Sequence, residues 1–123
     1  MLALLLALHA TALLVAAPAP PPLKIAGIGH VLGENIAIGN SCHFVSGPLL
    51  FDAWEDFLQK APPGKEELVE EALDAYHQSY SKTISRFDEH DEQLLKVCSA
   101  GDDVYVFTSS LSSKLMAKYK WDE

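Results

Sequence analysis

The sequence predicts a small, mainly helical domain of about four helices with one or two short strands, closed by one disulfide bond; an α+β arrangement is the alternative. Three observations predict this fold class. Apolar residues recur every three or four positions through most of residues 48–121, as they do along one face of a helix. Only two short regions have the composition of strands. The chain contains two cysteines, Cys42 and Cys98, which is the number needed for one bridge.

The chain begins with nineteen residues, 1–19, that carry no charged side chain and consist largely of Leu and Ala. This composition, ending in small alanines, is typical of a secretory signal peptide. A membrane anchor would need about 20 apolar residues, whereas prolines interrupt this run from Pro18 onward. We therefore expect a cleavable signal peptide over 1–19, one secreted domain over 20–123, and no stable membrane insertion after cleavage.

The charge of the chain limits its partners. It has 17 acidic and 9 basic residues, all after the leader, and a formal net charge of −8. Nucleic acids and anionic lipid surfaces bind clustered Lys and Arg. The sequence therefore disfavours both classes of partner.

The region before the helices is rich in Pro and then in Gly. Residues 18–22 predict a proline-rich, extended tether. Residues 23–44 combine several glycines with Ile, Val and Ala, and we expect this segment to be irregular or to form a hairpin of 24–28 with 36–38.

The first helix is predicted from Pro48, because proline at the first turn loses no hydrogen bond. It ends before Pro62-Pro63-Gly64, which cannot continue a helix. Its apolar stripe consists of Leu50, Trp54, Phe57, Leu58 and Ala61.

The second and longest helix is predicted over 65–87. Its first turn carries Glu66 and Glu67, where the helix dipole favours negative charge. The apolar stripe consists of Val69, Leu73, Tyr76, Tyr80, Ile84 and Phe87. The solvent face is predicted to carry Glu66, Glu67, Glu70, Glu71 and Asp74.

Three further elements follow. A short helix is predicted over 91–99 and a strand over 104–107, where Val-Tyr-Val-Phe is β-branched and aromatic. A last helix is predicted from Leu111 to Trp121, with serines as N-terminal caps.

In an exported chain, Cys42 and Cys98 predict a disulfide bond with each other. On the chain-entropy model, closing a loop of this length stabilises the fold by about 4 kcal/mol. Two intermolecular bridges in a dimer, or two free thiols, are the alternatives.

No motif predicts an active site, a metal site or a cofactor. Gly27-Ile28-Gly29 resembles the start of a dinucleotide fingerprint, but Leu32 occupies the place of the third glycine. The acidic run 88–92 is interpreted as a solvated turn, because adjacent residues on a helix cannot all face one ion. The histidines lie on different elements, at His30, His43, His77 and His90. We expect no catalysis.

The sequence predicts a small secreted binding protein that acts through protein–protein interaction. The alternative is a carrier of a small hydrophobic ligand in a helical cavity, since aromatic residues are numerous for a short chain. These are Trp54, Phe57, Tyr76, Tyr80, Phe87, Tyr105, Phe107 and Tyr119. The cysteine layout, one before the first helix and one at the end of the third, is similar to that of secretoglobin-like carriers. This similarity covers spacing only and implies no site residue.

Overall fold

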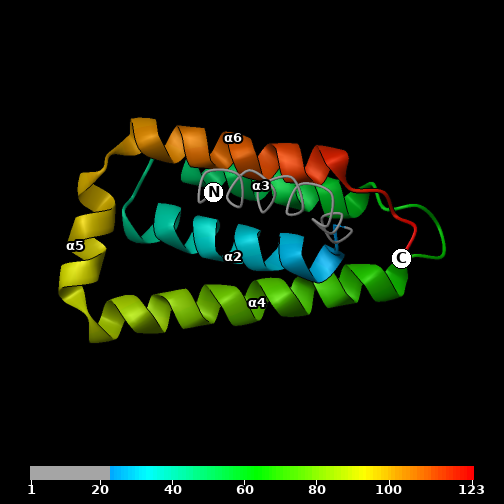
Figure 1. Cartoon of the computed structure of the whole chain (residues 1–123), viewed down its shortest axis with the longest axis horizontal. Coiled ribbons are helices and arrows are strands. Elements are labelled where there is room, and N and C mark those ends of the chain that lie inside the picture. Colours follow the sequence, from blue (N-terminus) through cyan, green and yellow to red (C-terminus); the bar gives the residue numbers. More distant parts are fainter. Residues whose placement is uncertain (1–22) are drawn as a thin grey trace, which may run out of the picture.

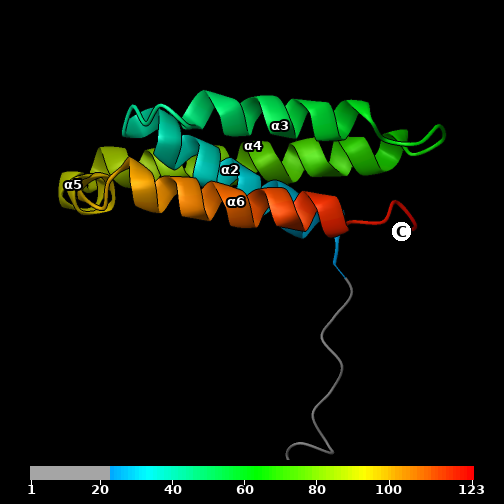
Figure 2. The same ribbon diagram turned by 90° about the horizontal axis from the view of Figure 1, so that it is seen from above.

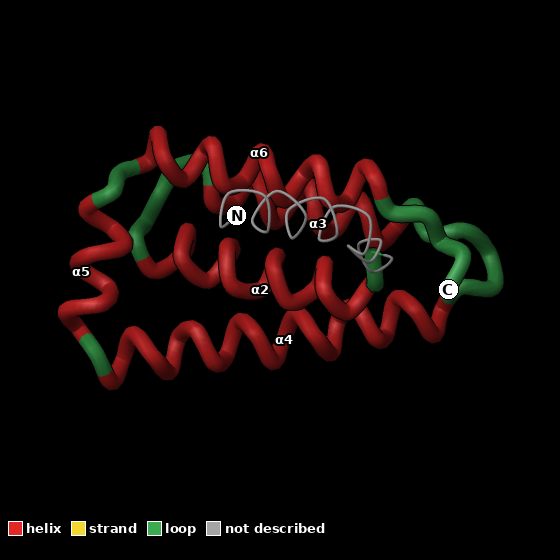
Figure 3. Tube along the Cα trace, viewed as in Figure 1, coloured by secondary structure: helices red, strands yellow, loops and turns green. Residues whose placement is uncertain are grey.

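The computed structural model describes residues 23–123. The predicted signal peptide at 1–19 and the predicted tether at 18–22 lie outside the described residues. Within 23–123 the mainly helical fold is confirmed, whereas both predicted strand regions are helical (Figure 3). The helices are α2 (Ile25–Ser41), α3 (Gly47–Gln59), α4 (Glu66–Glu89), α5 (Asp91–Ser99) and α6 (Asp102–Lys118).

Helix α2 lies at the centre of the bundle and contacts each of the other four described helices. Figure 1 shows α2 between α4 and α6, and the view from above in Figure 2 shows α3 and α6 on either side of it. Helices α2 and α4 run in one direction, and α3 and α6 run in the opposite one. The short α5 crosses the end of the bundle and connects α4 to α6.

The prediction of an irregular segment or hairpin for 23–44 is wrong, because most of this segment is α2. Ile25, Ile28, Leu32 and Ile36 on this helix are completely buried. A helix surrounded by neighbours is apolar around much of its circumference and shows no narrow apolar stripe. The absence of that stripe, together with several glycines, made the segment look unlike a helix.

Two of these glycines allow α2 and α4 to meet at backbone distance. A Cβ atom at Gly29 would collide with the carbonyl oxygen of Ala72, and one at Gly33 would collide with the carbonyl oxygen of Tyr76. Glycine inside a helix costs about 1 kcal/mol relative to alanine. Here the close packing of two long helices outweighs that cost.

The predicted strand at 104–107 is also wrong, because these residues form the beginning of α6. Among the four, Tyr105 alone is buried, so the side chains do not alternate between two faces as they would in a strand. Gly101, at a φ of 87°, precedes the helix, and Asp102 lies in its first turn, where negative charge is favourable. The last helix therefore starts nine residues before the predicted Leu111 and ends at Lys118 rather than at Trp121.

The other three helices agree with the sequence pattern. Helix α3 contains proline at its first turn, α4 begins with Glu66 and Glu67, and α5 has the predicted bounds. The acidic residues predicted for the solvent face of α4 are all exposed; they are Glu66, Glu67, Glu70, Glu71 and Asp74.

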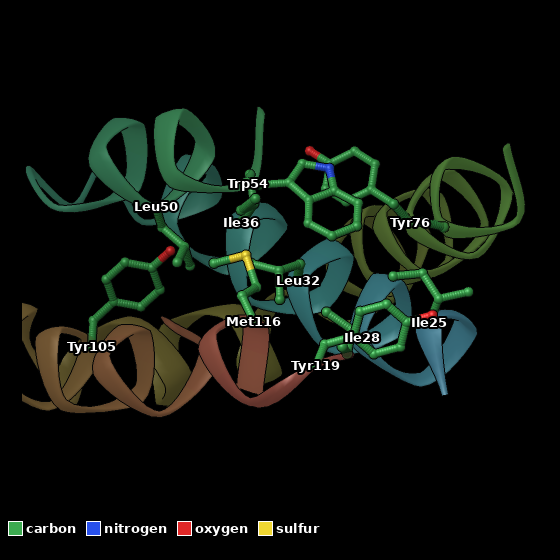
Figure 4. Packing of buried hydrophobic residues seen from close by; sticks show 11 residues of the cluster. Ile25, Ile28, Leu32, Ile36, Leu50, Trp54, Tyr76, Tyr105, Met116 and Tyr119 are labelled. Atoms are coloured by element: carbon green, nitrogen blue, oxygen red, sulfur yellow. The ribbon is translucent and has the colours of Figure 1, made fainter. Parts of the chain in front are cut away.

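Aromatic side chains fill the core between α2, α3 and α4 (Figure 4). The ring of Trp54 stacks on Tyr76 with 5.5 Å between centroids, and on Phe57 with 5.8 Å. Phe57 in turn stacks on Trp121 at 5.1 Å. Burial, followed by the nearby Tyr80 and Glu55, raises the pKa of Tyr76 to about 12, so its hydroxyl stays neutral at physiological pH.

The predicted bridge is confirmed within one chain, because Cys42 and Cys98 are bonded with their Cα atoms 5.3 Å apart. The bond connects the end of α2 to α5. It therefore fixes the end of the bundle from which α6 starts. Nearby, the hydroxyl of Ser46 donates a hydrogen bond of 2.8 Å to Oδ1 of Asp102, linking the starts of α3 and α6.

Helix α6 is attached to α2 through polar side chains. Asn35 donates from Nδ2 to the hydroxyl of Ser112 at 2.6 Å. The hydroxyl of Tyr105 donates to the carbonyl oxygen of Asn35 at 2.7 Å. These bonds fix the rotation of α6 about its axis and so decide which of its residues face outward.

Candidate functional site

The outer face of α6 carries large apolar side chains in contact with solvent. Val104 is 53% exposed, Phe107 66% and Leu111 47%. Val106, on the side of α6 toward α3, is also exposed. Contiguous exposed apolar surface in a folded protein marks a binding surface more often than single exposed residues do. We call Val104, Val106, Phe107 and Leu111 the α6 face.

Helical periodicity explains why these residues point outward. Tyr105, Ser112 and Met116 are buried and face α2. With 100° between successive residues, Phe107 lies on the side opposite Ser112. Leu111 lies next to Phe107 at a spacing of four, as neighbours on a helix surface do. The hydrogen bond from Asn35 to Ser112 and the one from Tyr105 to the Asn35 carbonyl hold the helix in this orientation.

The α6 face also lacks charge. Asp103 and Lys114 are charged, but none of the ten residues between them is. Besides the apolar side chains, these positions carry one threonine and four serines. Interface centres are depleted of charged residues relative to the rest of a protein surface. The α6 face has that composition, although the chain as a whole is strongly acidic.

Two shallow clefts flank the α6 face. One, of about 260 Å³, lies between α2, α5 and α6 and includes Ile38, Val97 and Val104 among its lining residues. The other, of about 310 Å³, lies between α3 and α6 and brings Leu49 close to Val106. Apolar side chains of a partner could enter both clefts, which continue the α6 face on either side.

A third cleft, of about 340 Å³, lies between α3 and α4. Apolar residues dominate its lining, with Glu55 and His77 also present. Its apolar lining consists of Phe51, Trp54, Leu58, Val69, Leu73 and Tyr76. Pockets for small ligands begin at about 300 Å³. This cleft is the place in the described residues that best fits the alternative expectation of a ligand carrier.

The four histidines in the described residues lie in three places. His30 and His90 line one cleft of about 410 Å³ together with Lys82 and Arg86. His77 contacts the ring of Tyr76 on the outside of α4, and His43 lies in the loop after α2. His30 and His90 thus share a cleft, whereas His43 and His77 lie apart from it.

The acidic run 88–92 lies at the turn between α4 and α5, as interpreted from the sequence. His90 Nδ1 lies 3.4 Å from the carboxylate of Glu92. No set of three or more His, Cys, Asp or Glu side chains in residues 23–123 is placed to hold a metal ion.

The sequence pattern did contain the α6 face, but the strand interpretation concealed it. Tyr105, Ser112 and Met116 follow a helical spacing on one side, and Phe107 and Leu111 follow one on the other. One of these stripes faces the core, and the other is the exposed apolar stripe of the α6 face.

Comparison with known proteins gives no relative from which a function could be carried over. No protein-family model, curated protein or solved structure matches the chain. In the described part of the chain, none of the helices has both the length and the apolar composition needed to span a membrane.

Proposed function

We propose that this is a secreted binding protein that acts, without catalysis, by holding another protein on the α6 face. The observation that carries the proposal is the exposure of Phe107 in the middle of a helix whose other side is buried. Exposed aromatic residues surrounded by smaller neighbours are the usual centres of binding energy at protein interfaces. The proposal retains the function expected from the sequence and adds a surface to it.

The charges at the two ends of α6 define the chemistry of the partner. Asp102 and Asp103 lie at the start of the helix, and Lys114 and Lys118 lie toward its end. A complementary surface is apolar and uncharged in the middle, basic next to Asp103 and acidic next to Lys114.

Export is part of the proposal. The apolar leader over 1–19 supports it, and so does the disulfide between Cys42 and Cys98, because disulfides persist in oxidising compartments. Mass spectrometry of the chain from a secreting host tests this part. We expect a mass that lacks the leader and two hydrogens, and retention of the full leader would contradict export.

Binding is tested with three forms of the whole mature chain, each immobilised on a solid support. Each support is then incubated with the extracellular fluid of the producing cells. These are the natural sequence, a double variant Phe107→Ser/Leu111→Ser, and a control, Leu95→Ser. Leu95 is 72% exposed on α5, outside the α6 face. Proteins retained by the natural chain are identified and purified, and their Kd values are measured.

We expect at least one such protein to bind the double variant at least about tenfold more weakly, since centres of binding energy are worth 2 kcal/mol or more. The control should leave its Kd within about twofold. If no protein distinguishes the double variant from the control, the α6 face is not the binding surface.

A second candidate function is the carriage of a small apolar ligand, which the cleft between α3 and α4 favours. The buried indole of Trp54 forms part of its lining. A ligand that enters this cleft should change the fluorescence of Trp54 saturably, and Leu73→Glu should abolish the change. Titration with apolar fluorophores tests this candidate, and an unchanged spectrum with every probe contradicts it.

A further inference from the structure

We propose that the partner on the α6 face is a second copy of this chain, with the two α6 helices packed antiparallel about a two-fold axis. The inference rests on the proposed function, because it names the occupant of the same surface. It is carried by the order of residues along the outermost stripe of α6.

That stripe consists of Asp103, Phe107, Ser110 and Lys114. All four are exposed, and they lie opposite the residues of α6 that face the core. Their spacings of four, three and four are those of the contact seam between two packed helices. The stripe therefore has the geometry of a short helix–helix seam that no described helix covers.

Antiparallel pairing makes this stripe complementary to itself. With the two-fold axis between Thr108 and Ser109, Asp103 faces Lys114 of the second copy. Phe107 then faces Ser110 of the second copy, where the small side chain leaves room for the ring. Because the interface is symmetric, each of these pairs occurs twice.

The residues beside the stripe extend the same match. On one flank Val104 comes next to Leu111 of the second copy. By symmetry, Leu111 comes next to Val104 of the second copy at the other end of the same flank. On the opposite flank Val106 comes next to Ser113 of the second copy. Val104 and Leu111 of the two copies thus lie beside the Phe107 rings and exclude water on that flank, as at other interface centres.

Charge favours this face and this direction. A parallel arrangement would place Asp103 beside Asp103 of the second copy, which is repulsive. The other large solvent face, on α4, begins with Glu66, Glu67, Glu70 and Glu71, and two acidic copies would repel there. The α6 face is where two chains of net charge −8 can approach without bringing carboxylates together.

The pairing of one helix with its copy gives a small interface. Interfaces below about 1,200 Å² in total are typical of weak and transient complexes, so we expect a Kd on the order of 10 μM. Sedimentation equilibrium of the mature, disulfide-bonded chain over concentrations on either side of that value measures it.

Charge exchange between the ends of the seam tests the register. Asp103→Lys alone places two Lys residues together, and Lys114→Glu alone places two carboxylates together. Each should weaken dimerisation about tenfold, because two pairs change sign in every dimer. The double variant Asp103→Lys/Lys114→Glu restores opposite charges between the copies and should return the Kd to within about threefold of the natural value.

Phe107→Ser should abolish the dimer at concentrations up to about 100 μM, whereas Leu95→Ser should not change its Kd. Circular dichroism of each variant checks that the helices are intact. A natural chain that remains monomeric at about 0.5 mM, a dimer that survives Phe107→Ser, or a double charge variant no tighter than the single variants each overturns the inference. A different protein whose binding depends on Phe107 would then still support the proposed function, and its absence would remove both.

Discussion

Helices α4 and α6 both pack against α2, but their outer faces differ in kind. The exposed side of α4 carries Glu66, Glu67, Glu70 and Glu71 in its first turns, followed by basic residues near its end. The exposed side of α6 has an uncharged centre built around Phe107. Charged side chains keep a helix surface hydrated, whereas exposed apolar ones lower the free energy only when something covers them. The contrast separates a hydrated, charged surface from the uncharged surface that we propose binds a partner.

The inner faces differ as well. Helix α4 lies against α2 at backbone distance, at Gly29 and Gly33. Helix α6 is held by side-chain hydrogen bonds through Asn35. We infer that the close contact between α2 and α4 stabilises the fold, whereas the hydrogen bonds through Asn35 set which residues of α6 face outward. The four predictions below test this division, from the largest expected effect to the smallest.

The largest effect is expected from removing the disulfide, which fixes α5 between the two helices. Cys42→Ser/Cys98→Ser should lower the free energy of unfolding by about 4 kcal/mol, since the bridge closes a loop with a sequence separation of 56 residues. Urea unfolding measures this, and hydrogen exchange should show the start of α6 losing protection before α4. Reduction of the natural chain is the control and should give the same curve. A loss below about 1 kcal/mol would mean that α5 is held by its packing instead.

Two phenylalanines compare the helices with the same substitution. Phe87 on α4 is 3% exposed and Phe107 on α6 is 66% exposed. Phe87→Ala should lower the free energy of unfolding by about 3 kcal/mol, because it leaves a cavity. Phe107→Ala should change it by less than about 0.5 kcal/mol when measured on the monomer. Equal losses in thermal unfolding would mean that Phe107 supports the fold, and the α6 face would lose its central argument.

Glycine substitutions test the close packing of α2 on α4. At Gly33 an added Cβ would lie 3.0 Å from Cβ of Ser79 and would overlap the carbonyl oxygen of Tyr76. Gly33→Ala should therefore destabilise the fold by about 2 kcal/mol. Gly27, on the same helix, has nothing within 4 Å of its added Cβ, so Gly27→Ala should stabilise the fold by about 0.5–1 kcal/mol. Effects of the same sign in chemical denaturation would contradict the packing role of Gly33.

Much of the fold could be predicted from local patterns. The stripe with Trp54 and Phe57, the break at Pro62-Pro63 and the acidic first turn of α4 each indicated a helix that the structure contains. Helix α2 could not be predicted this way. Its glycines have low helix propensity, and their value appears only when the backbone of α4 lies against them, which is a tertiary contact.

The α6 face could not be predicted from local patterns either, because it too depends on a tertiary contact. The residues of 104–107 have high strand propensity, and propensity alone predicts a strand there. Burial of Tyr105 against α2, together with its hydrogen bond to the carbonyl of Asn35, fixes a helix instead and turns Phe107 outward. The pairing of Cys42 with Cys98 was predictable because a chain with two cysteines has one intramolecular possibility.

The smallest effect concerns the attachment of the C-terminus beside α6. The carboxylate of Glu123 accepts hydrogen bonds from the backbone N–H of Ile25, at 2.7 Å, and from the hydroxyl of Tyr119, at 2.5 Å. Its side chain is 16% exposed, and Lys24 lies 4.0 Å away. Burial alone would raise the pKa of Glu123, but the hydrogen bonds from Tyr119 and Ile25, with the charge of Lys24, hold it below its usual value of 4.5.

A lowered pKa in the folded state means that the ionised carboxylate stabilises the fold above the usual value of 4.5, and that this contribution is lost as the pH falls through the folded-state pKa. Glu123→Gln should therefore lower the free energy of unfolding by about 1.5 kcal/mol near neutral pH, the lower end of the range for a hydrogen bond to a charged group. The two chains should converge in strong acid, where Glu123 is protonated. Unfolding curves across this range measure the difference. If it stays constant with pH, the charge of Glu123 contributes nothing and the C-terminus is held to α2 by the packing of Tyr119 alone.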